Sequence, residues 1–299
     1  MLSSSKHPYE VRFAPVPLDN EFPIHSGGPY WRPKDRPITY LHVHQALELG
    51  YCHEGSGIFV VGGKVMPYMA ADVSVINASE PHLARSAPGT ESTWRFITLD
   101  PIRLLGPAAD VNVIDPSPLA GPEFRNILTG PDATSVAPLM LRLITELDTR
   151  GAEHRSAIKA IVWLLIVELK RIAPRTPQHP AVPSSHYARI APALAYLAGH
   201  LSESLRVVDL ANRCGLSEPH FRRLFIQAIG KSPHSYWLNL RLQMACSLLR
   251  STSLSVLEIS EQAGFETLSN FNRAFRKQFH TTPREWRRNP EIANRHSSP

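Results

Sequence analysis

One sequence pattern occurs twice in the last hundred residues of the chain. Each copy has a short apolar segment, a glycine, and a second segment with basic or amide side chains. The glycines are Gly215 and Gly264, and a small residue, Ala211 or Ser260, stands four positions before each. A small residue lets two helices pack closely, and glycine adopts the positive φ that a sharp turn needs. The pattern predicts two helix-turn-helix units, whose second helices would enter DNA major grooves.

The second segment of each copy has apolar residues at helical spacing, so they should form one buried stripe. These residues are Phe221, Leu224, Phe225 and Ala228 in the first copy, and Phe271, Ala274, Phe275 and Phe279 in the second. The polar positions between them then face outward, namely His220, Arg222 and Arg223 in the first copy, and Ser269, Asn270, Asn272 and Arg273 in the second. Arginine and asparagine can each make paired hydrogen bonds to base edges. We expect these faces to contact DNA, with solvation as the alternative for any single residue.

The segment between the two copies is expected to form a connecting helix. Leucine and alanine recur at helical spacing from Ser235 to Leu249. A helix of this length spans about 22 Å. It could hold two recognition helices at a fixed separation, near the roughly 34 Å of one DNA turn. Ser232-Pro233 predicts a helix start just before this segment. Farther along, Thr282 and Glu285 have the spacing of a capping box, which predicts another helix start.

The stretch Leu205 to Arg288 resembles the AraC/XylS family of bacterial transcription regulators. The resemblance rests on Asp209-Leu210-Ala211, Cys214-Gly215-Leu216-Ser217, His220-Phe221-Arg222-Arg223-Leu224-Phe225, Arg241-Leu242, Gly264-Phe265, Asn270-Phe271, Phe275-Arg276 and Thr282-Pro283-Arg284-Glu285-Trp286. It implies DNA contacts from the residues that match Pro219, Arg222 and Arg223, and Leu268, Ser269, Asn272 and Arg273. Ser260 departs from the alanine usual in the family, but it is still small.

The resemblance also implies a function. Members of this family regulate transcription, more often as activators, and the match implies RNA polymerase as a partner besides double-stranded DNA in two adjacent major grooves. We therefore expect a regulator and not an enzyme. The rival hypothesis is a metal-dependent cupin enzyme fused to a DNA-binding domain. A third is a constitutive DNA binder whose N-terminal domain is only a scaffold.

The charge of the chain is concentrated in its C-terminal part. The formal net charge is +6, and the residues from 185 onward carry 15 Lys and Arg against 8 Asp and Glu. The remainder carries 17 and 18. A basic C-terminal domain is expected to attract DNA phosphates.

The cysteine content and the hydropathy of the chain bear on its cellular location. Its three cysteines, Cys52, Cys214 and Cys246, are too few for a disulfide framework. The longest clearly apolar run, Ala160 to Val167, is far shorter than the roughly 20 residues of a membrane span. With no signal-peptide pattern, we expect a cytoplasmic protein.

The N-terminal part has a different pattern, with short β-branched or aromatic segments divided by Gly, Pro or Asn. The segments are 41–44, 57–61, 72–76 and 93–99. Such spacing is typical of a β-barrel or sandwich. Gly62-Gly63 is expected to form a hairpin turn. With helices elsewhere, we expect a multidomain α+β protein with an N-terminal cupin-like barrel.

Four polar residues give this domain a candidate site: His42, His44, Glu48 and His82. Together with Gly55 and the Pro81-His82 pair they resemble a cupin and the effector-binding domain that precedes AraC-type DNA-binding domains. On a strand, His42 and His44 share one face. We expect a pocket for a small organic effector, with a first-row transition metal and a purely structural role as alternatives, and we commit to no cofactor. The chain departs from metal-binding cupins at two positions where they have glycine, Arg36 and Ala71.

A helical hairpin and a linker complete the expected organisation. Two apolar stripes between Thr134 and Arg171, separated by Gly151, predict two antiparallel helices. The resemblance implies a homodimer interface there, with packing within one chain as the alternative. The expected divisions are a barrel at 1–118, a helical region at 119–172, a Pro-rich linker at 173–186, the DNA-binding domain at 187–288 and a tail at 289–299.

Overall fold

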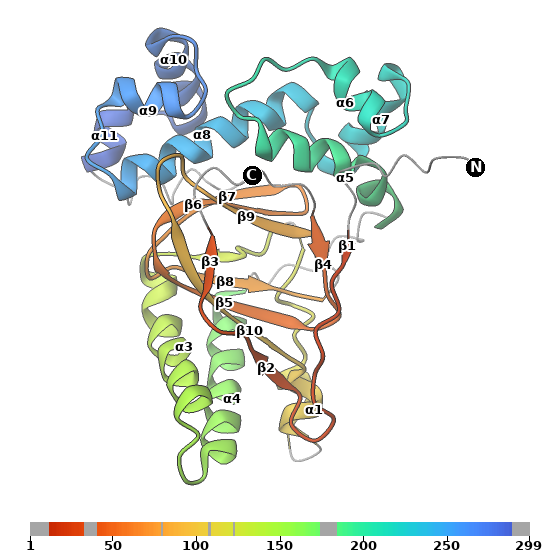
Figure 1. Ribbon diagram of the computed structural model, residues 1–299, viewed down its shortest axis with the longest axis vertical. Helices are drawn as coiled ribbons and strands as arrows, with labels where there is room; N and C mark the ends of the chain where they lie inside the picture. The colour runs from red at the N-terminus through yellow and green to blue at the C-terminus, as the bar shows by residue number, and fades with distance from the viewer. Residues whose placement is uncertain are drawn as a thin grey trace.

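A computed structural model describes residues 12–32, 41–78, 80–106, 109–121, 123–173 and 184–288. The chain is a two-domain α+β protein, in which strands and a long helical hairpin precede a layer of helices (Figure 1). The predicted linker falls mostly on 174–183 and the predicted tail on 289–299, both outside the described residues.

The described strands form two sheets. One has the order β1 (Arg12–Phe13), β4 (His42–Val43), β9 (His82–Ser86), β6 (Ser56–Val61) and β7 (Lys64–Met69). The other has the order β11 (Ile127–Leu128), β8 (Val73–Ile76), β5 (Leu47–Glu54), β10 (Ser92–Leu99) and β2 (Ile24–Ser26), and β3 (Tyr30–Arg32) also pairs with β10. Among these strands no backbone ladder joins one sheet to the other, so the expected barrel is a pair of sheets and is not closed. The aromatic side chains of Phe59, Tyr68 and Trp94 fill a buried cluster in this domain.

Strand β6 is covered by packed side chains on both of its faces. Every residue of this strand is buried, and alternate side chains belong to different cores. Phe59 and Val61 lie in the cluster with Trp94, whereas Ile58 and Val60 lie in the cluster of the C-terminal helices. Alternation places successive side chains on opposite faces of a sheet. The predicted turn is confirmed, since Gly62, with φ of 54°, joins β6 to β7.

The predicted helical pair is α3 (Pro131–Thr149) and α4 (His154–Ile172), with Gly151 between them. Their buried faces share a core with β5 and β8, including Leu49 and Val75. Two short helices, α1 (Pro101–Leu105) and α2 (Val111–Ile114), lead from the second sheet toward this hairpin. No helix among the described residues is long and apolar enough to cross a membrane.

The C-terminal helices are α5 (Ser184–Gly199), α6 (Val207–Arg213), α7 (Glu218–Ile229), α8 (Pro233–Ser251), α9 (Val256–Gln262), α10 (Leu268–Phe279) and α11 (Pro283–Arg288). Helix α5 begins inside the segment expected to be linker. Helix α8 extends beyond the segment from Ser235 to Leu249 at both ends. The helix start predicted at Ser232-Pro233 is confirmed, since the Ser232 hydroxyl caps the first turn and Pro233 occupies the first position.

Helix α8 is tied to the first helix-turn-helix unit through a buried arginine. The Arg241 guanidinium lies 3.4 Å from the centroid of the Trp237 ring and donates hydrogen bonds to the carbonyls of Leu201 and Glu203 at 2.5 and 3.0 Å. Gly264, with φ of 89°, is needed at the same place, since a Cβ there would lie 2.4 Å from the Leu201 oxygen. The two units therefore share one core.

Candidate nucleic-acid interface and effector site

Helices α7 and α10 are the second helices of the two helix-turn-helix units. Their predicted stripes are confirmed, because Phe221, Phe225, Phe271 and Phe275 are fully buried. The predicted DNA-contacting residues lie on the other face. Pro219, Arg222, Arg223, Ser269, Asn270, Asn272 and Arg273 are exposed, and His220 and Leu268 are half-buried. Each unit thus presents a polar recognition surface on a packed support.

The basic residues on these surfaces differ in how they are held. Arg222 forms an ion pair with Glu218 one turn earlier on α7, at 2.7 Å. Arg223 makes no hydrogen bond or ion pair within the described part of the chain, so its guanidinium can reach a base edge without first breaking one. In α10, Arg273 donates to the Asn270 side-chain oxygen at 3.0 Å. Arg223 is therefore the best placed of the three for base contact. Arg273, held by a neutral amide, has a weaker contact to give up than Arg222, which is held by a carboxylate.

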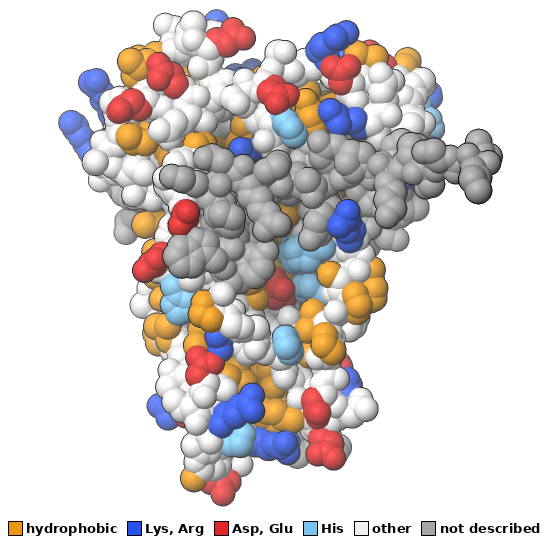
Figure 2. Space-filling model, viewed as in Figure 1, with side chains coloured by type: hydrophobic (Ala, Val, Ile, Leu, Met, Phe, Trp, Pro, Cys, Tyr) orange, Lys and Arg blue, Asp and Glu red, His pale blue; other side chains and the backbone are white. Residues whose placement is uncertain are grey.

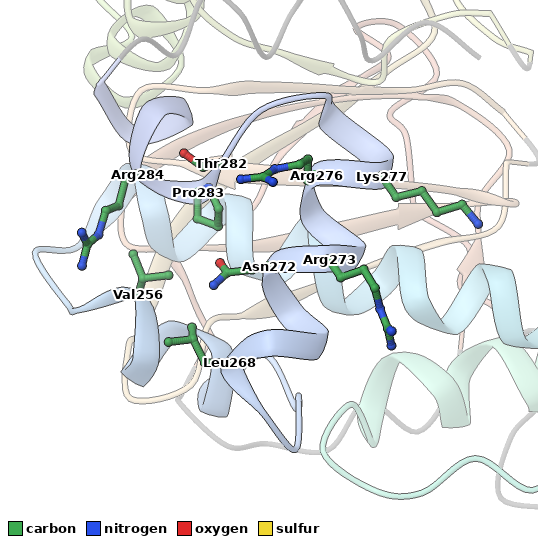
Figure 3. A pocket seen from close by; sticks show the side chains of 9 residues that line it. All are labelled: Val256, Leu268, Asn272, Arg273, Arg276, Lys277, Thr282, Pro283 and Arg284. Carbon is green, nitrogen blue, oxygen red and sulfur yellow. The ribbon is translucent and has the colours of Figure 1, made fainter.

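A basic groove of about 670 Å³ lies beside α10 (Figure 3). It is lined by Val256, Leu268, Asn272, Arg273, Arg276, Lys277, Thr282, Pro283 and Arg284. Arg276 points toward Pro283 at the start of α11, whereas Lys277 points away from that helix (Figure 3). Basic side chains also line the outer edge of α9 to α11 in Figure 2. This groove was missed in the sequence, although Arg273, Arg276 and Lys277 recur at one-turn spacing.

Replacing Lys277 by alanine tests whether the groove contacts phosphate. One fewer neutralised phosphate should reduce the slope of log K against log salt by about 0.9. The preferred DNA sequence should stay the same, because phosphate contacts carry no base information. Lys159→Ala, at an exposed position of α4, is the matched control and should leave the slope unchanged. Fluorescence anisotropy over a salt series measures both, and equal slopes for the two variants would remove the groove from the interface.

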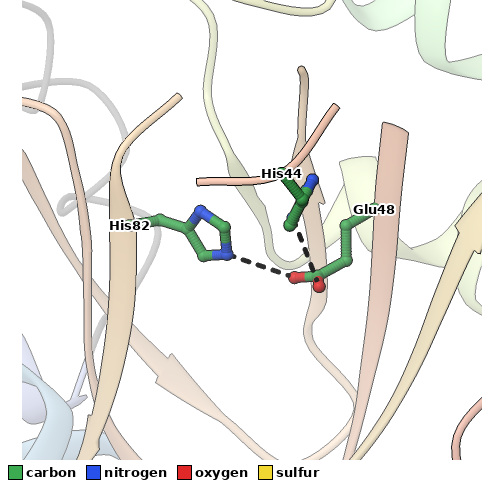
Figure 4. A group of neighbouring side chains, drawn as sticks. All are labelled: His44, Glu48 and His82. Carbon is green, nitrogen blue, oxygen red and sulfur yellow. Dashed lines mark ion pairs between the residues drawn. The ribbon is translucent and has the colours of Figure 1, made fainter. Parts of the chain in front are cut away.

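In the N-terminal domain, three of the four predicted polar residues meet. His44 follows β4, His82 lies on β9 of the same sheet, and Glu48 lies on β5 of the other sheet. The Nε2 atom of His44 lies 3.4 Å from Oε2 of Glu48, and the Nε2 atom of His82 lies 3.5 Å from Oε1 of the same carboxylate (Figure 4). His42 does not belong to this group, and its ring packs against the His82 ring with centroids 4.0 Å apart.

Electrostatics favour the charged forms in this cluster. Burial opposes ionisation of Glu48, but hydrogen bonds from His44 and His82 outweigh it and lower the pKa of the carboxyl. Burial likewise opposes protonation of His44, but Glu48 outweighs it and raises the pKa of the imidazole. The cluster therefore favours a buried Glu48 carboxylate facing the two imidazole rings, with protonation of His44 made easier by that carboxylate.

Backbone contacts fix the orientation of both rings. His44 Nδ1 donates to the Ala46 carbonyl, and His82 Nδ1 donates to the Glu80 carbonyl, both at 2.9 Å. A carbonyl only accepts, so each Nδ1 carries a proton and each Nε2 directs either a proton or a lone pair at Glu48. The same orientation suits metal ligation, because a carbonyl partner on the second nitrogen orders a liganding histidine.

These three residues fit a divalent metal in donor type. Two imidazole nitrogens and a carboxylate oxygen suit a first-row transition ion, and the three ligand atoms all lie within 4.8 Å of one another. Tetrahedral bonds of about 2.1 Å would place ligand atoms roughly 3.4 Å apart. The two Nε2–Oε distances are close to this value. The geometry of the cluster is therefore compatible with either occupant, an organic effector or a metal ion.

Comparison with known proteins gives two family matches. A model of the AraC-like ligand binding domain matches residues 28–166, and a model of a helix-turn-helix domain matches residues 210–289. Both the β-rich segment and the repeated motif thus match independently. The two matched ranges contain the histidine cluster and the two recognition helices, respectively.

Individual relatives agree with these matches. The HTH-type transcriptional regulator GbdR of Pseudomonas aeruginosa is 31% identical over 169 residues, which cover 54% of this chain and 44% of GbdR. The Right origin-binding protein of Escherichia coli is 37% identical over 98 residues, 33% of this chain and 34% of that protein. A solved AraC-type transcriptional regulator from Chromobacterium violaceum is 34% identical, covering 34% of this chain and 94% of that chain, with a TM-score of 0.32. The match thus spans less than half the length of these two curated relatives. From the two domain matches together, the chain belongs to the AraC family.

Proposed function

We propose that this chain is a sequence-specific DNA-binding transcription regulator controlled by a small molecule bound in its N-terminal domain. The observation that carries the proposal is the pair of recognition surfaces on α7 and α10, both exposed and both built on one core. The shared core lets α8 set the separation of the two surfaces. With 19 residues, α8 spans about 28 Å, of the order of one DNA turn.

Selection of duplexes from a random pool tests this proposal. The full chain should enrich a sequence with two short conserved blocks about one helical turn apart. Repeating the selection with cell extract shows whether a ligand changes affinity. Recovery of a random pool, with no enriched sequence at low salt, would contradict sequence-specific binding.

The proposed effector site is the cluster of His44, Glu48 and His82. Support comes from its burial between the sheets and from the Phe59 ring, which stacks on the His82 ring with centroids 6.3 Å apart. A ligand that replaces one imidazole–carboxylate contact would couple the two sheets differently. Control by such a ligand requires that it binds two states of the protein with different affinity.

Metal content separates this proposal from the enzyme alternative. We expect purified protein, dialysed without chelator, to hold substoichiometric divalent metal by plasma mass spectrometry. Glu48→Gln should abolish the response to extract in the DNA-binding assay, while the variant still prefers the selected duplex, because the cluster lies outside the DNA-binding domain. A stoichiometric metal that is lost in Glu48→Gln would instead favour the metal-dependent alternative.

The remaining parts of the proposal concern assembly. We propose a homodimer through α3 and α4, because Leu141 and Leu164 on these helices are 41% and 44% exposed. Activation of transcription, contact with RNA polymerase and a cytoplasmic location complete the proposed role, and they rest on the family alone. Analytical ultracentrifugation of Leu141→Glu against the original chain tests the dimer.

A further inference from the structure

The DNA-binding domain rests directly on the first sheet of the N-terminal domain. Helix α8 lies across strands β6 and β7 (Figure 1). Ile58 and Val60 of β6 and Leu83 of β9 belong to the same buried cluster as the apolar residues of α5 and α8. The two domains are therefore in contact through packed side chains, besides being joined by the chain.

Polar contacts from one face of α8 add to this packing. The Ser247 hydroxyl donates to the Tyr68 carbonyl at 3.3 Å, and the Ser251 hydroxyl donates to the Ser56 hydroxyl at 2.8 Å. Ser247 and Ser251 are one turn apart, as required for a shared face. Between them, an Arg250 guanidinium nitrogen lies 3.4 Å from the Asp72 carboxylate.

Asp72 connects this contact to the strand that carries Glu48. Its side chain is only 5% exposed and lies in the turn between β7 and β8. Two backbone hydrogen bonds join this turn to Cys52 of β5. The Cys52 N–H donates to the Asp72 carbonyl at 3.0 Å, and the Ala71 N–H donates to the Cys52 carbonyl at 2.8 Å. Glu48 lies four residues earlier on the same strand. A displacement of β5 by a ligand at the histidine cluster would thus reach Asp72 directly.

The contact of Arg250 lies beside the second helix-turn-helix unit, and a further contact lies beside the first. Arg85 of β9 donates to the carbonyl of Ala198, near the end of α5. Helix α5 packs against α6 and α7 of the first unit, whereas Arg250 lies just before α9 of the second. The N-terminal domain therefore contacts the DNA-binding domain at two places, through Arg85 beside the first unit and through Asp72 beside the second. Both recognition surfaces stay exposed.

We propose that the contact of α8 with β6 and β7, centred on Asp72 and Arg250, is a releasable latch that restrains DNA binding. Docked, each unit is also tied to the N-terminal domain, which restricts the small changes in orientation of α7 and α10 that fitting two grooves requires while α8 keeps their separation. Released, both recognition helices can seat at once. The latch rests on the proposed function, and it acts by restraint because the docked sheet does not cover the recognition surfaces.

A disulfide across the interface tests the latch within one protein. The hydroxyl oxygens of Ser56 and Ser251 are 2.8 Å apart, so cysteines at both positions can reach the S–S distance of about 2.05 Å. Diamide would oxidise the two thiols in Ser56→Cys/Ser251→Cys, and dithiothreitol would reduce them again. The native thiols should not interfere, because burial raises the pKa of Cys214 to about 11 and raises those of Cys52 and Cys246 further.

The measurement is the affinity of the oxidised and reduced double variant for the duplex selected above. We expect the oxidised form to bind at least about fivefold more weakly, and reduction to restore the affinity. The original chain, treated with the same reagents, should not respond. Equal or tighter binding by the oxidised form would overturn the latch. Failure of every form, including the original chain, to prefer that duplex would instead overturn the proposed function.

Arg250→Gln tests the latch without a covalent bond. This change leaves the buried Asp72 carboxylate without its counterion, so the docked state should be disfavoured at pH 7.5. Burial raises the pKa of Asp72 to about 6, partly opposed by Arg250, so in the original chain the carboxyl is ionised at that pH; without Arg250 its pKa rises further, and the docked state loses the ion pair in either protonation state. We expect tighter duplex binding and faster amide exchange in β7. Arg171→Gln, in an exposed ion pair of α4, is the matched control. Binding by Arg250→Gln equal to that of the control would count against the latch.

Discussion

Replacing both Arg223 and Arg273 by alanine is expected to weaken binding to the selected duplex by about 30-fold to over 10⁴-fold. Each arginine that reads a base contributes about 1–3 kcal/mol. The residues belong to different recognition helices, so their effects should add. Binding to random duplex should fall much less, because only the specific contacts are lost while most of the basic surface remains.

Competition anisotropy with specific and random duplexes measures this ratio. Arg142→Ala/Lys159→Ala removes two exposed charges from the helical hairpin and is the matched control. If Arg223→Ala/Arg273→Ala loses the same factor of affinity for the specific and the random duplex, the arginines bind phosphate and do not read sequence. Arg222→Ala should have a smaller effect than Arg223→Ala, because Arg222 is already paired with Glu218.

The second large effect concerns the support of the recognition helix α10. Phe275 is fully buried, and its ring lies 5.5, 4.6 and 6.2 Å from the rings of Phe271, Phe279 and Trp286. Phe275→Ala should lower the free energy of unfolding by about 3–5 kcal/mol, from lost burial and the cavity left behind. Urea unfolding followed by circular dichroism measures it.

The control for this variant is Leu257→Ala on α9. Leu257 is 49% exposed, so its truncation should change the free energy of unfolding by less than about 0.5 kcal/mol. A loss of under about 1 kcal/mol in Phe275→Ala would mean that the aromatic cluster of α10 is not a tightly packed core.

The C-terminal domain was largely predictable from the sequence because its signals are local. Helical spacing of Phe221 and Phe225, and the positive φ required at Gly215 and Gly264, are set within one or two turns. The predicted capping box is confirmed, with Glu285 accepting from the Thr282 N–H at 2.9 Å. Helix α5 was missed although Ile190, Leu194 and Leu197 recur at helical spacing.

The N-terminal domain was less predictable because its contacts are distant in sequence. Strands β5 and β7 were not among the predicted segments, and the expected cupin-like barrel is a pair of sheets without a ladder between them, since pairing of strands depends on partners far along the chain. The meeting of His44 and Glu48 with His82 was anticipated. His42 was grouped with them on strand alternation and on the resemblance to cupins, but its ring packs against His82 instead of facing Glu48. The continuous apolar run of β6 is typical of a strand that is buried on both faces, although only a strand was predicted there. That its outer face is covered by α8 could not be read from the run itself.

The most direct test of the central claim is a hydroxyl-radical and methylation footprint of the full chain on its selected duplex. Two recognition helices on one core should protect guanine N7 positions in two successive major grooves, about 10 base pairs apart on one face of the duplex. Protection in a single groove, or none in either, would contradict the claim that both units engage DNA together.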